Sequence, residues 1–260
     1  MRCAVVGHVE WVEFARVPRM PAAGEIVHAD RVWEEPAGGG AVVARQLALL
    51  AGHCELFTAL GDDALGRASA ERLAELGIDV HVKWGGATRR AWTHVDGAGE
   101  RTITVLGDKL LPAAPLPLDG YDLVFFVAGE PEALRSARRA RFVAGTAREL
   151  PTLQKGDVEL DLLVASVNDP GERYDGSLRP RHVALTDGAN GGTIDGEPYA
   201  AASTSRIVDT YGAGDSFAAA LAFALARGDD PRAAAELAAG AGAAVIGGAG
   251  PYEAQLAFRV

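Results

Sequence analysis

The chain is short of cysteine, of positive charge and of long hydrophobic runs. Only Cys3 and Cys54 among its 260 residues are cysteine, which excludes a disulfide framework, and their spacing fits no zinc pattern. The 35 acidic residues outnumber the 25 basic ones, and the formal charge of -10 repels nucleic-acid backbones. No run approaches the roughly 18 apolar residues that cross a membrane. We therefore expect neither nucleic-acid nor membrane partners.

Size and the first residues complete this general picture. A length of 260 residues with 48% hydrophobic residues suits one domain spanning residues 1–260 with a large buried core. A single arginine precedes the short apolar run at residues 3–6, which is not the pattern of a signal peptide. We therefore expect a reducing, cytoplasmic location.

Short apolar runs alternate with helical patterns along the chain. Continuous apolar runs of four or five residues are typical of strands covered on both faces, as in a parallel sheet. The alternation predicts an α/β layered fold. The predicted strands are residues 3–6, 55–60, 123–127, 162–165 and 183–185, and the predicted helices are residues 41–51, 64–76, 216–227 and 231–245.

Two segments interrupt the alternation. Residues 10–33 contain no good helix, and within residues 90–106 two β-type runs flank the turn Asp96-Gly97-Ala98-Gly99, which predicts a hairpin. The two segments either pair into a small β appendage or are separate surface excursions. Residues 110–119 hold three prolines and predict a loop rather than a domain boundary.

The most informative segment is residues 209–217, Asp-Thr-Tyr-Gly-Ala-Gly-Asp-Ser-Phe, which leads into a predicted helix. The free N–H groups of a helix's first turn form an anion site, and Gly212 and Gly214 let a ligand approach the backbone closely. Asp215 would then stand beside a site for negative charge. This placement makes chemical sense if its carboxylate removes a proton from a hydroxyl that attacks phosphorus. The plain alternative is an aspartate that caps a glycine-rich turn.

Other phosphate-binding and metal-binding motifs are absent from the sequence. None of the three lysines, Lys83, Lys109 and Lys155, precedes Ser or Thr, so there is no Walker A motif. The third glycine of a dinucleotide fingerprint is missing after residues 212–214 and 240–242. The six histidines show no ligand spacing. We expect no metal held by protein side chains alone.

Residues 209–215 resemble the C-terminal signature of the ribokinase (phosphofructokinase-B) family of carbohydrate and nucleoside kinases. The resemblance runs from about residue 3 to residue 250. It implies a ribokinase-like, three-layer, Rossmann-like domain with a mostly parallel central sheet. It also implies a small β-sheet lid, formed by about residues 10–33 and 90–106. Four shorter motifs occur in the family's order, at residues 21–25, 38–40, 61–66 and 186–191.

The resemblance implies transfer of the γ-phosphoryl group of ATP, bound with Mg²⁺, to a hydroxyl of a small carbohydrate or sugar-like acceptor. Asp215 matches the catalytic base, and the backbone of Gly212, Ala213 and Gly214 matches the anion hole. One alternative is a nucleoside kinase of the same family. Another is a catalytically silent ligand-binding protein on this scaffold. The lids of family members often pair, which implies a homodimer.

Further residues are assigned to the site by the same resemblance. The acceptor side comprises His8, Glu10, Gly38, Gly39, Val43 and Asp215. The nucleotide side comprises Ser166, Asn168, Thr186, Gly188, Gly191, Gly212 and Gly214. Asp169 is matched to Mg²⁺, and Asp209 and Tyr211 to a monovalent cation such as K⁺. Arg101, in the predicted hairpin, either reaches an anion on the substrate or is exposed without a role.

Three departures from the family affect the acceptor and the metal. Val43 stands where sugar kinases carry an asparagine, and Val12 stands where they carry an aspartate, with Glu10 at a matching polar position. The family's Asn-x-x-Glu corresponds to residues 166–169 or, shifted, to residues 168–172; strand lengths favour the first. A site that loses hydroxyl partners changes its preferred ligand. A nucleoside and a sugar held by Glu10 both remain open.

Overall fold

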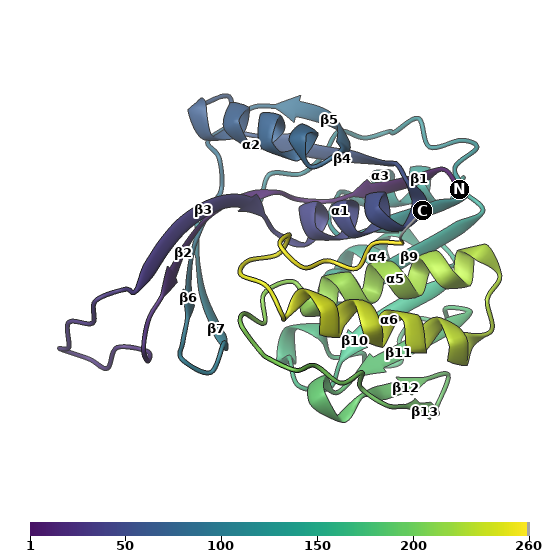
Figure 1. Cartoon of the computed structure of the whole chain (residues 1–260). Helices are drawn as coiled ribbons and strands as arrows, with labels where there is room; N and C mark the ends of the chain where they lie inside the picture. The colour runs from purple at the N-terminus through teal and green to yellow at the C-terminus, as the bar shows by residue number, and fades with distance from the viewer. Residues whose placement is uncertain (259–260) are drawn as a thin grey trace.

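Residues 1–258 are described by a computed structural model, in which a nine-stranded sheet, a separate four-stranded sheet and six α-helices are found (Figure 1). The large sheet contains β1 (Cys3–Val6), β4 (Cys54–Leu60), β5 (Ile78–Trp84), β8 (Leu123–Phe126), β9 (Phe142–Thr146), β10 (Leu162–Ser166), β11 (His182–Thr186), β12 (Gly192–Ile194) and β13 (Glu197–Tyr199). The small sheet contains β2 (Glu10–Arg16), β3 (Arg31–Ala37), β6 (Arg90–Val95) and β7 (Arg101–Leu106). The helices are α1 (Gly39–Ala51), α2 (Ala64–Glu75), α3 (Pro131–Ala137), α4 (Leu150–Gly156), α5 (Ala213–Arg227) and α6 (Pro231–Val245).

The large sheet is parallel from β11 to β5 and changes winding direction beside β1. Its order is β13-β12-β11-β10-β9-β8-β1-β4-β5, and only β12 and β13 are antiparallel. The chain builds β4 and β5 on one side of β1 and then returns to place β8 on the other side. Ligands of such sheets bind outside the carboxyl ends of the strands at this reversal. The segments that follow β1 and β8 therefore border the expected site.

Helices cover both faces of the large sheet, as the α/β pattern predicts. One core cluster joins the sheet to α1, α2, α5 and α6 through residues such as Leu47, Leu73 and Leu221. A second cluster joins the opposite face to α3 and α4 through Leu134 and Leu153. These two clusters confirm the three-layer architecture. No helix among residues 1–258 has the length and apolar character that a membrane span requires.

The four-stranded sheet, here called the lid, projects from the main body (Figure 1). Its order is β3-β2-β6-β7, and the parallel pairing of β2 with β6 joins two segments that lie far apart in the sequence. The predicted β appendage is therefore present. Its first segment extends beyond residue 33 to Ala37, because β3 is an edge strand and an edge strand tolerates Pro36.

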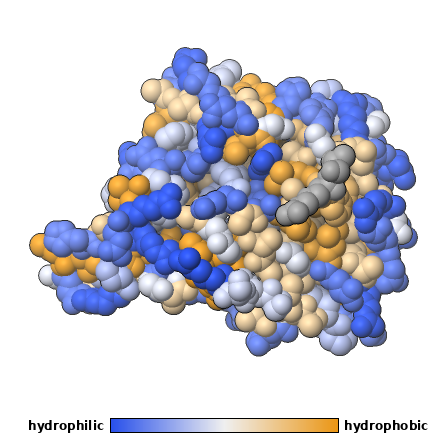
Figure 2. All heavy atoms as spheres, in the orientation of Figure 1, coloured by the Kyte–Doolittle hydropathy of each residue, from blue (hydrophilic) through white to orange (hydrophobic). Residues whose placement is uncertain are grey.

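The two faces of the lid have different surroundings. Val12, Phe14 and Ala91 point toward the main body and pack against Tyr211. Hydrophobic side chains also reach the surface of the projecting part (Figure 2), where Ile26 is 88% exposed and Val32 is 71% exposed. Packing on one face thus anchors the lid beside the loop that leads into α5.

Candidate active site

The loop before α5 leaves the first turn of that helix open. Gly212 caps the helix in the left-handed conformation, with φ of 81°, and no side chain caps this end. No heavy atom lies within 4 Å of the position that a Cβ on Gly214 would take. The helix begins at Ala213, three residues earlier than predicted, so that Asp215 stands in its first turn. An anion therefore has direct access to the positive end of α5.

Buried hydrogen bonds fix this loop. The carboxylate of Asp209, which has no exposed surface, accepts from the backbone N–H groups of Tyr211 at 2.9 Å and of Gly250 at 2.8 Å. The hydroxyl of Tyr211 accepts from the N–H of Gly38 at 3.1 Å. Asp209 thus ties the loop to the C-terminal segment, and Tyr211 ties it to the start of α1.

Asp215 faces the start of α1. A Cβ placed on Gly39 would lie 3.1 Å from its Oδ1 atom, so the glycine leaves room beside the carboxylate. Burial raises the pKa of Asp215 to about 6, and Glu172 adds to this shift, whereas Arg101 and Arg148 oppose it. The group is still mostly ionised at neutral pH, and its basicity is higher than that of an ordinary aspartate. Both properties suit a general base.

The residues that follow β1 lie beside Gly38, the residue before Gly39. A Cβ placed on Gly38 would lie 3.2 Å from Cδ2 of His8 and 3.3 Å from Cγ of Glu10. Burial, with a contribution from nearby cationic side chains, lowers the pKa of His8 to about 3, so its ring is neutral. Because Gly38 and Gly39 are consecutive, His8, Glu10 and Asp215 flank one short stretch of backbone. The structure therefore brings these predicted residues together.

Glu10 has a buried partner that sequence reasoning missed. Nε of Arg89 lies 3.3 Å from Oε2 of Glu10, and the two side chains are 15% and 8% exposed. The preceding residue, Thr88, donates its N–H and its hydroxyl to Asp63 at 2.8 and 2.6 Å, which fixes the start of β6 against the N-cap of α2. Arg89 stands two positions before Ala91 on the inward face of the lid. This period-two spacing is the signal that would have found it.

The predicted nucleotide-side residues gather at the carboxyl ends of β10 and β11. Nδ2 of Asn168 donates to Asp187 at 2.9 Å, which links the loops after the two strands. A Cβ on Gly191 would lie 2.2 Å from the carbonyl oxygen of Tyr199, so only glycine fits there. The set that lies together is Ser166, Asn168, Thr186, Gly188 and Gly191.

A hollow begins beside Gly191, whose Cβ position is 2.8 Å from the backbone nitrogen of Ala201, the residue before the lining segment. Its volume is about 530 Å³, and residues 202–206 line it from one side. Small residues of α6 and the segment after it, Gly240, Ala243, Ala244 and Gly247, line the other side. Apart from Arg206, the wall is made of short side chains and backbone, which suits the close approach of a flat ring.

The family's Asn-x-x-Glu motif could end at Asp169 or at Glu172, and both of these acids form an ion pair with Arg148. Nη2 of Arg148 lies 2.6 Å from Asp169 and 3.0 Å from Glu172. Partial burial works against the charge of Asp169, yet the N–H of Gly171 and the guanidinium of Arg148 hold the pKa of that carboxyl below its usual range. The two acids are half-buried, and the charge of Glu172 acts on Asp215. Their hard oxygen atoms suit Mg²⁺.

Two further candidate site residues, Val43 and Arg101, lie apart from these groups. Val43 has no exposed surface and packs in the core beneath α1, so the structure does not bring it to the site. The helical register explains this placement, since Val43 lies on the buried stripe with Leu47 and Leu50. Arg101 is exposed on β7, and its Nη1 atom lies 3.4 Å from the carbonyl oxygen of Thr210. It therefore stands at the mouth of the site.

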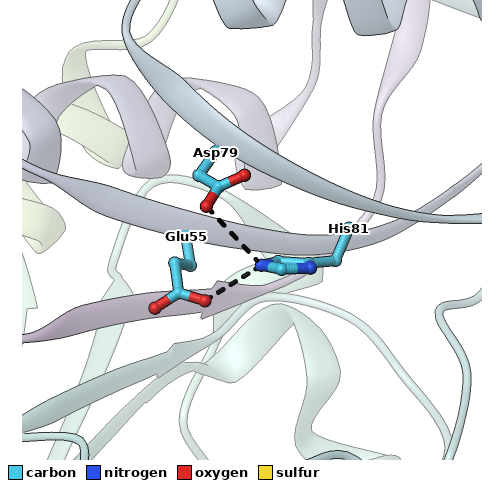
Figure 3. Close-up of side chains that lie close together, drawn as sticks. All are labelled: Glu55, Asp79 and His81. Atoms are coloured by element: carbon cyan, nitrogen blue, oxygen red, sulfur yellow. Dashed lines mark hydrogen bonds and ion pairs between the residues drawn. The ribbon is translucent and has the colours of Figure 1, made fainter.

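A separate cluster of ionisable groups lies at the amino ends of β4 and β5 (Figure 3). Nε2 of His81 lies 2.9 Å from Glu55 and 4.0 Å from Asp79, and Arg2 also pairs with Glu55 at 3.2 Å. The cluster is at the opposite edge of the sheet from Asp215. Ordinary ion pairs account for its geometry, and it is not part of the candidate site.

Comparison with known proteins identifies relatives along the whole chain. The ATP-dependent ribose-1-phosphate kinase of Halopiger xanaduensis is 27% identical over 288 residues, covering 100% of this chain and 97% of the relative. A fructokinase of Klebsiella pneumoniae is 36% identical over 103 residues, covering 38% of this chain and 33% of the relative.

Solved structures with the same fold agree over nearly the full length. A crystal structure described as a putative ribokinase from Agrobacterium tumefaciens superposes with a TM-score of 0.84 at 22% identity, covering 98% of this chain and 94% of that one. The nucleoside kinase of Burkholderia thailandensis, in complex with inosine, gives 0.79 at 19% identity with the same coverage. Residues 1–124 and 140–256 match the protein family described as pfkB family carbohydrate kinase. This protein therefore belongs to the pfkB family of carbohydrate kinases.

Proposed function

We propose that the protein transfers the γ-phosphoryl group of Mg·ATP to a hydroxyl of a small carbohydrate, with Asp215 as the general base. One observation carries the assignment of the base. The half-buried carboxylate of Asp215 stands in the first turn of α5, next to open backbone N–H groups and facing the space above Gly39. This arrangement offers a proton acceptor and a cradle for negative charge on the same helix end.

The proposed reaction needs one proton transfer and one displacement at phosphorus. Asp215 accepts the proton of the acceptor hydroxyl, whose oxygen forms a bond to the γ-phosphorus while the bond to the bridging oxygen of ADP breaks. The N–H groups at residues 212–214 stabilise the charge that develops on the migrating group. When bound, Mg²⁺ neutralises phosphate charge, and Asp169 and Glu172 are the carboxylates that would hold it. Arg148 orients both of these acids.

We place the base of ATP in the hollow between residues 202–206 and α6. A substitution of Gly240 by Leu tests this placement, since no heavy atom lies within 4 Å of a Cβ at Gly240. The added side chain is expected to fill the hollow and raise KM for ATP by about 10-fold or more. Steady-state kinetics measures this, with Ala233→Leu, on an exposed part of the same helix, as the control. A KM for ATP equal in both variants would contradict the placement.

The acceptor is tested with a panel of alcohols and detection of ADP release. One relative carries the name ribose-1-phosphate kinase and another the name fructokinase, so the panel contains pentoses, hexoses, their phosphates and nucleosides. We expect turnover of at least one sugar or sugar phosphate that depends on Mg²⁺ and ATP. Turnover of nucleosides alone would favour the nucleoside kinase alternative. ATP binding without turnover of any alcohol would favour the silent binding protein.

Three expectations stay predictions. Both oxygens of Asp209 are occupied by backbone hydrogen bonds, so a monovalent cation near Asp209 and Tyr211 would be bound by backbone carbonyl groups. Pairing of two lids into a homodimer is expected from the family resemblance. A cytoplasmic location is also expected.

A further inference from the structure

The loop that leads into the anion hole is held on one side by the lid. Residues 207–212 belong to no helix or strand, so their position depends on individual contacts. The N–H of Thr210 donates to the carbonyl oxygen of Gly99, in the turn between β6 and β7, at 2.9 Å. The carbonyl oxygen of Val208 accepts from Nη1 of Arg16, on β2, at 2.9 Å. Two separate parts of the lid are therefore bonded to the backbone of this loop.

Side chains next to the same turn add weaker contacts. The hydroxyl of Thr210 lies 3.5 Å from Oε2 of Glu100, and its carbonyl oxygen lies 3.4 Å from Nη1 of Arg101. That carbonyl oxygen also accepts from the N–H of Ala213 at 3.4 Å. Ala213 belongs to the anion hole, so the lid and the anion hole share one acceptor group. A movement of the turn relative to Thr210 therefore reaches the anion hole directly.

The other side of the loop is anchored to the segment that follows α6. The N–H of Val208 donates to the carbonyl oxygen of Ile246 at 2.8 Å, and the carboxylate of Asp209 accepts from the N–H of Gly250 at 2.8 Å. The loop thus runs between two supports, the lid and the C-terminal segment. Because the anion hole begins two residues after Thr210, the position of its N–H groups depends on both supports.

Arg16 makes a lid contact through its side chain. It follows Val12 and Phe14 in the inward-facing series of β2, with the period-two spacing of a strand. Its guanidinium donates to a backbone carbonyl group of the loop, and a hydrogen bond from a charged donor is stronger than one between neutral groups. Replacing this side chain therefore removes a strong contact and leaves the backbone pairing of β2 in place.

We infer that Arg16 and the turn between β6 and β7 position the anion hole, so that phosphoryl transfer depends on their contacts with residues 207–210. The inference rests on the proposed function, in which the N–H groups at residues 212–214 stabilise the migrating phosphoryl group. Arg16 acts through Val208 and is a positioning residue. Donors that are misplaced by about 1 Å can lower a rate by as much as about 100-fold.

The first experiment removes the donors of Arg16. Arg16→Met keeps most of the apolar stem, and we expect kcat to fall by about 10-fold or more while KM for the acceptor changes by less than about 3-fold. Arg16→Lys should recover part of kcat, because it keeps a charged donor. Arg31→Met is the matched control, since Arg31 lies opposite Arg16 on β3, is exposed and stands over the ring of Trp33. Melting temperatures show whether each variant folds.

The second experiment disturbs the turn. A Cβ on Gly99 would lie 2.9 Å from Cγ2 of Ile207 and 3.1 Å from the carbonyl oxygen of Val208, so Gly99→Ala should push the turn and the loop apart. Gly107, just after β7, has the same φ of 86°, and no heavy atom lies within 4 Å of its Cβ position. Gly107→Ala therefore has the same backbone strain without the contact. We expect kcat to fall by about 10-fold or more in Gly99→Ala only.

The outcomes separate this inference from the proposed function. Wild-type kcat in both Arg16→Met and Gly99→Ala would overturn the inference and leave the kinase assignment intact. A loss that falls equally on kcat and on KM for the acceptor, or that Arg16→Lys does not reduce, would show a merely structural role and also overturn it. If the wild type phosphorylated no alcohol, the proposed function would fail and the inference with it.

Discussion

Replacing Asp215 by Asn is expected to lower kcat by about 10²- to 10⁴-fold, the usual contribution of a general base. The amide has nearly the shape of the carboxylate but cannot accept the proton of the acceptor hydroxyl. The backbone N–H groups at residues 212–214 are untouched by this change, so ATP should still bind with a similar Kd. Steady-state kinetics with the best acceptor and calorimetry with a non-hydrolysable ATP analogue measure the two quantities.

The stability of the same variant is its control. The pKa of Asp215 is raised in the folded state to about 6, above the value of about 3.9 for an ordinary aspartate. The folded state therefore binds the proton more tightly than the unfolded state, and the ionised group costs stability as pH rises from about 4 through 6. Asp215→Asn removes this cost, so its melting temperature at pH 7.5 should equal or exceed that of the wild type. A less stable variant would instead make Asp215 a structural residue.

Replacing Gly39 by Ala is expected to lower kcat/KM for the acceptor by about 10²-fold. The new methyl group would lie 3.1 Å from Oδ1 of Asp215, in the space that the attacking hydroxyl needs. Displacement of reacting groups by about 1 Å can cost this much. The methyl would also lie 2.9 Å from Cγ1 of Val127, a buried and stiff side chain, so we expect a moderate loss of melting temperature as well. Kinetics with each substrate varied in turn should show the loss on the acceptor side and not for ATP.

The neighbouring position provides a contrast to Gly39. A Cβ on Gly40 would lie 2.5 Å from the backbone oxygen of His8 and 2.9 Å from the backbone carbon of Gly7. Gly40→Ala is therefore expected to lower the melting temperature more than Gly39→Ala, which should fold and lose activity. Wild-type kinetics in Gly39→Ala would show that the acceptor does not approach Asp215 from the side of α1.

The parts of the fold that could be predicted from the sequence have strong local patterns. The apolar runs of β1, β8 and β10 are covered on both faces, and the turn between β6 and β7 has the composition of a hairpin. β5 was missed because the predicted strands were continuous apolar runs, whereas β5 alternates polar and apolar residues, as a half-exposed strand at the edge of the sheet does. The short strands β12 and β13 were missed because three residues carry little pattern.

The site was predicted where it depends on one continuous segment. Residues 209–217 contain the loop, the glycines and Asp215, so their chemistry could be read from neighbours in sequence. The start of α5 could not be predicted in this way. Two glycines near Asp215 disfavour a helix in isolation, and packing against the rest of the fold determines where the helix begins. Other contacts join residues from distant segments. Arg148 pairs with Asp169 and Glu172, and Arg89 pairs with Glu10. Such contacts depend on the order of the strands.

The pH dependence of the ratio between wild-type and Asp215→Asn kcat/KM tests the central claim most directly. Taking the ratio cancels the titration of ATP and of the acceptor, which both enzymes share. Because the base acts only when deprotonated and its pKa is raised to about 6, the ratio should be constant above pH 7 and fall about 10-fold per pH unit well below 6. A ratio that stays the same from pH 5 to pH 8 would contradict the assignment of Asp215 as the base.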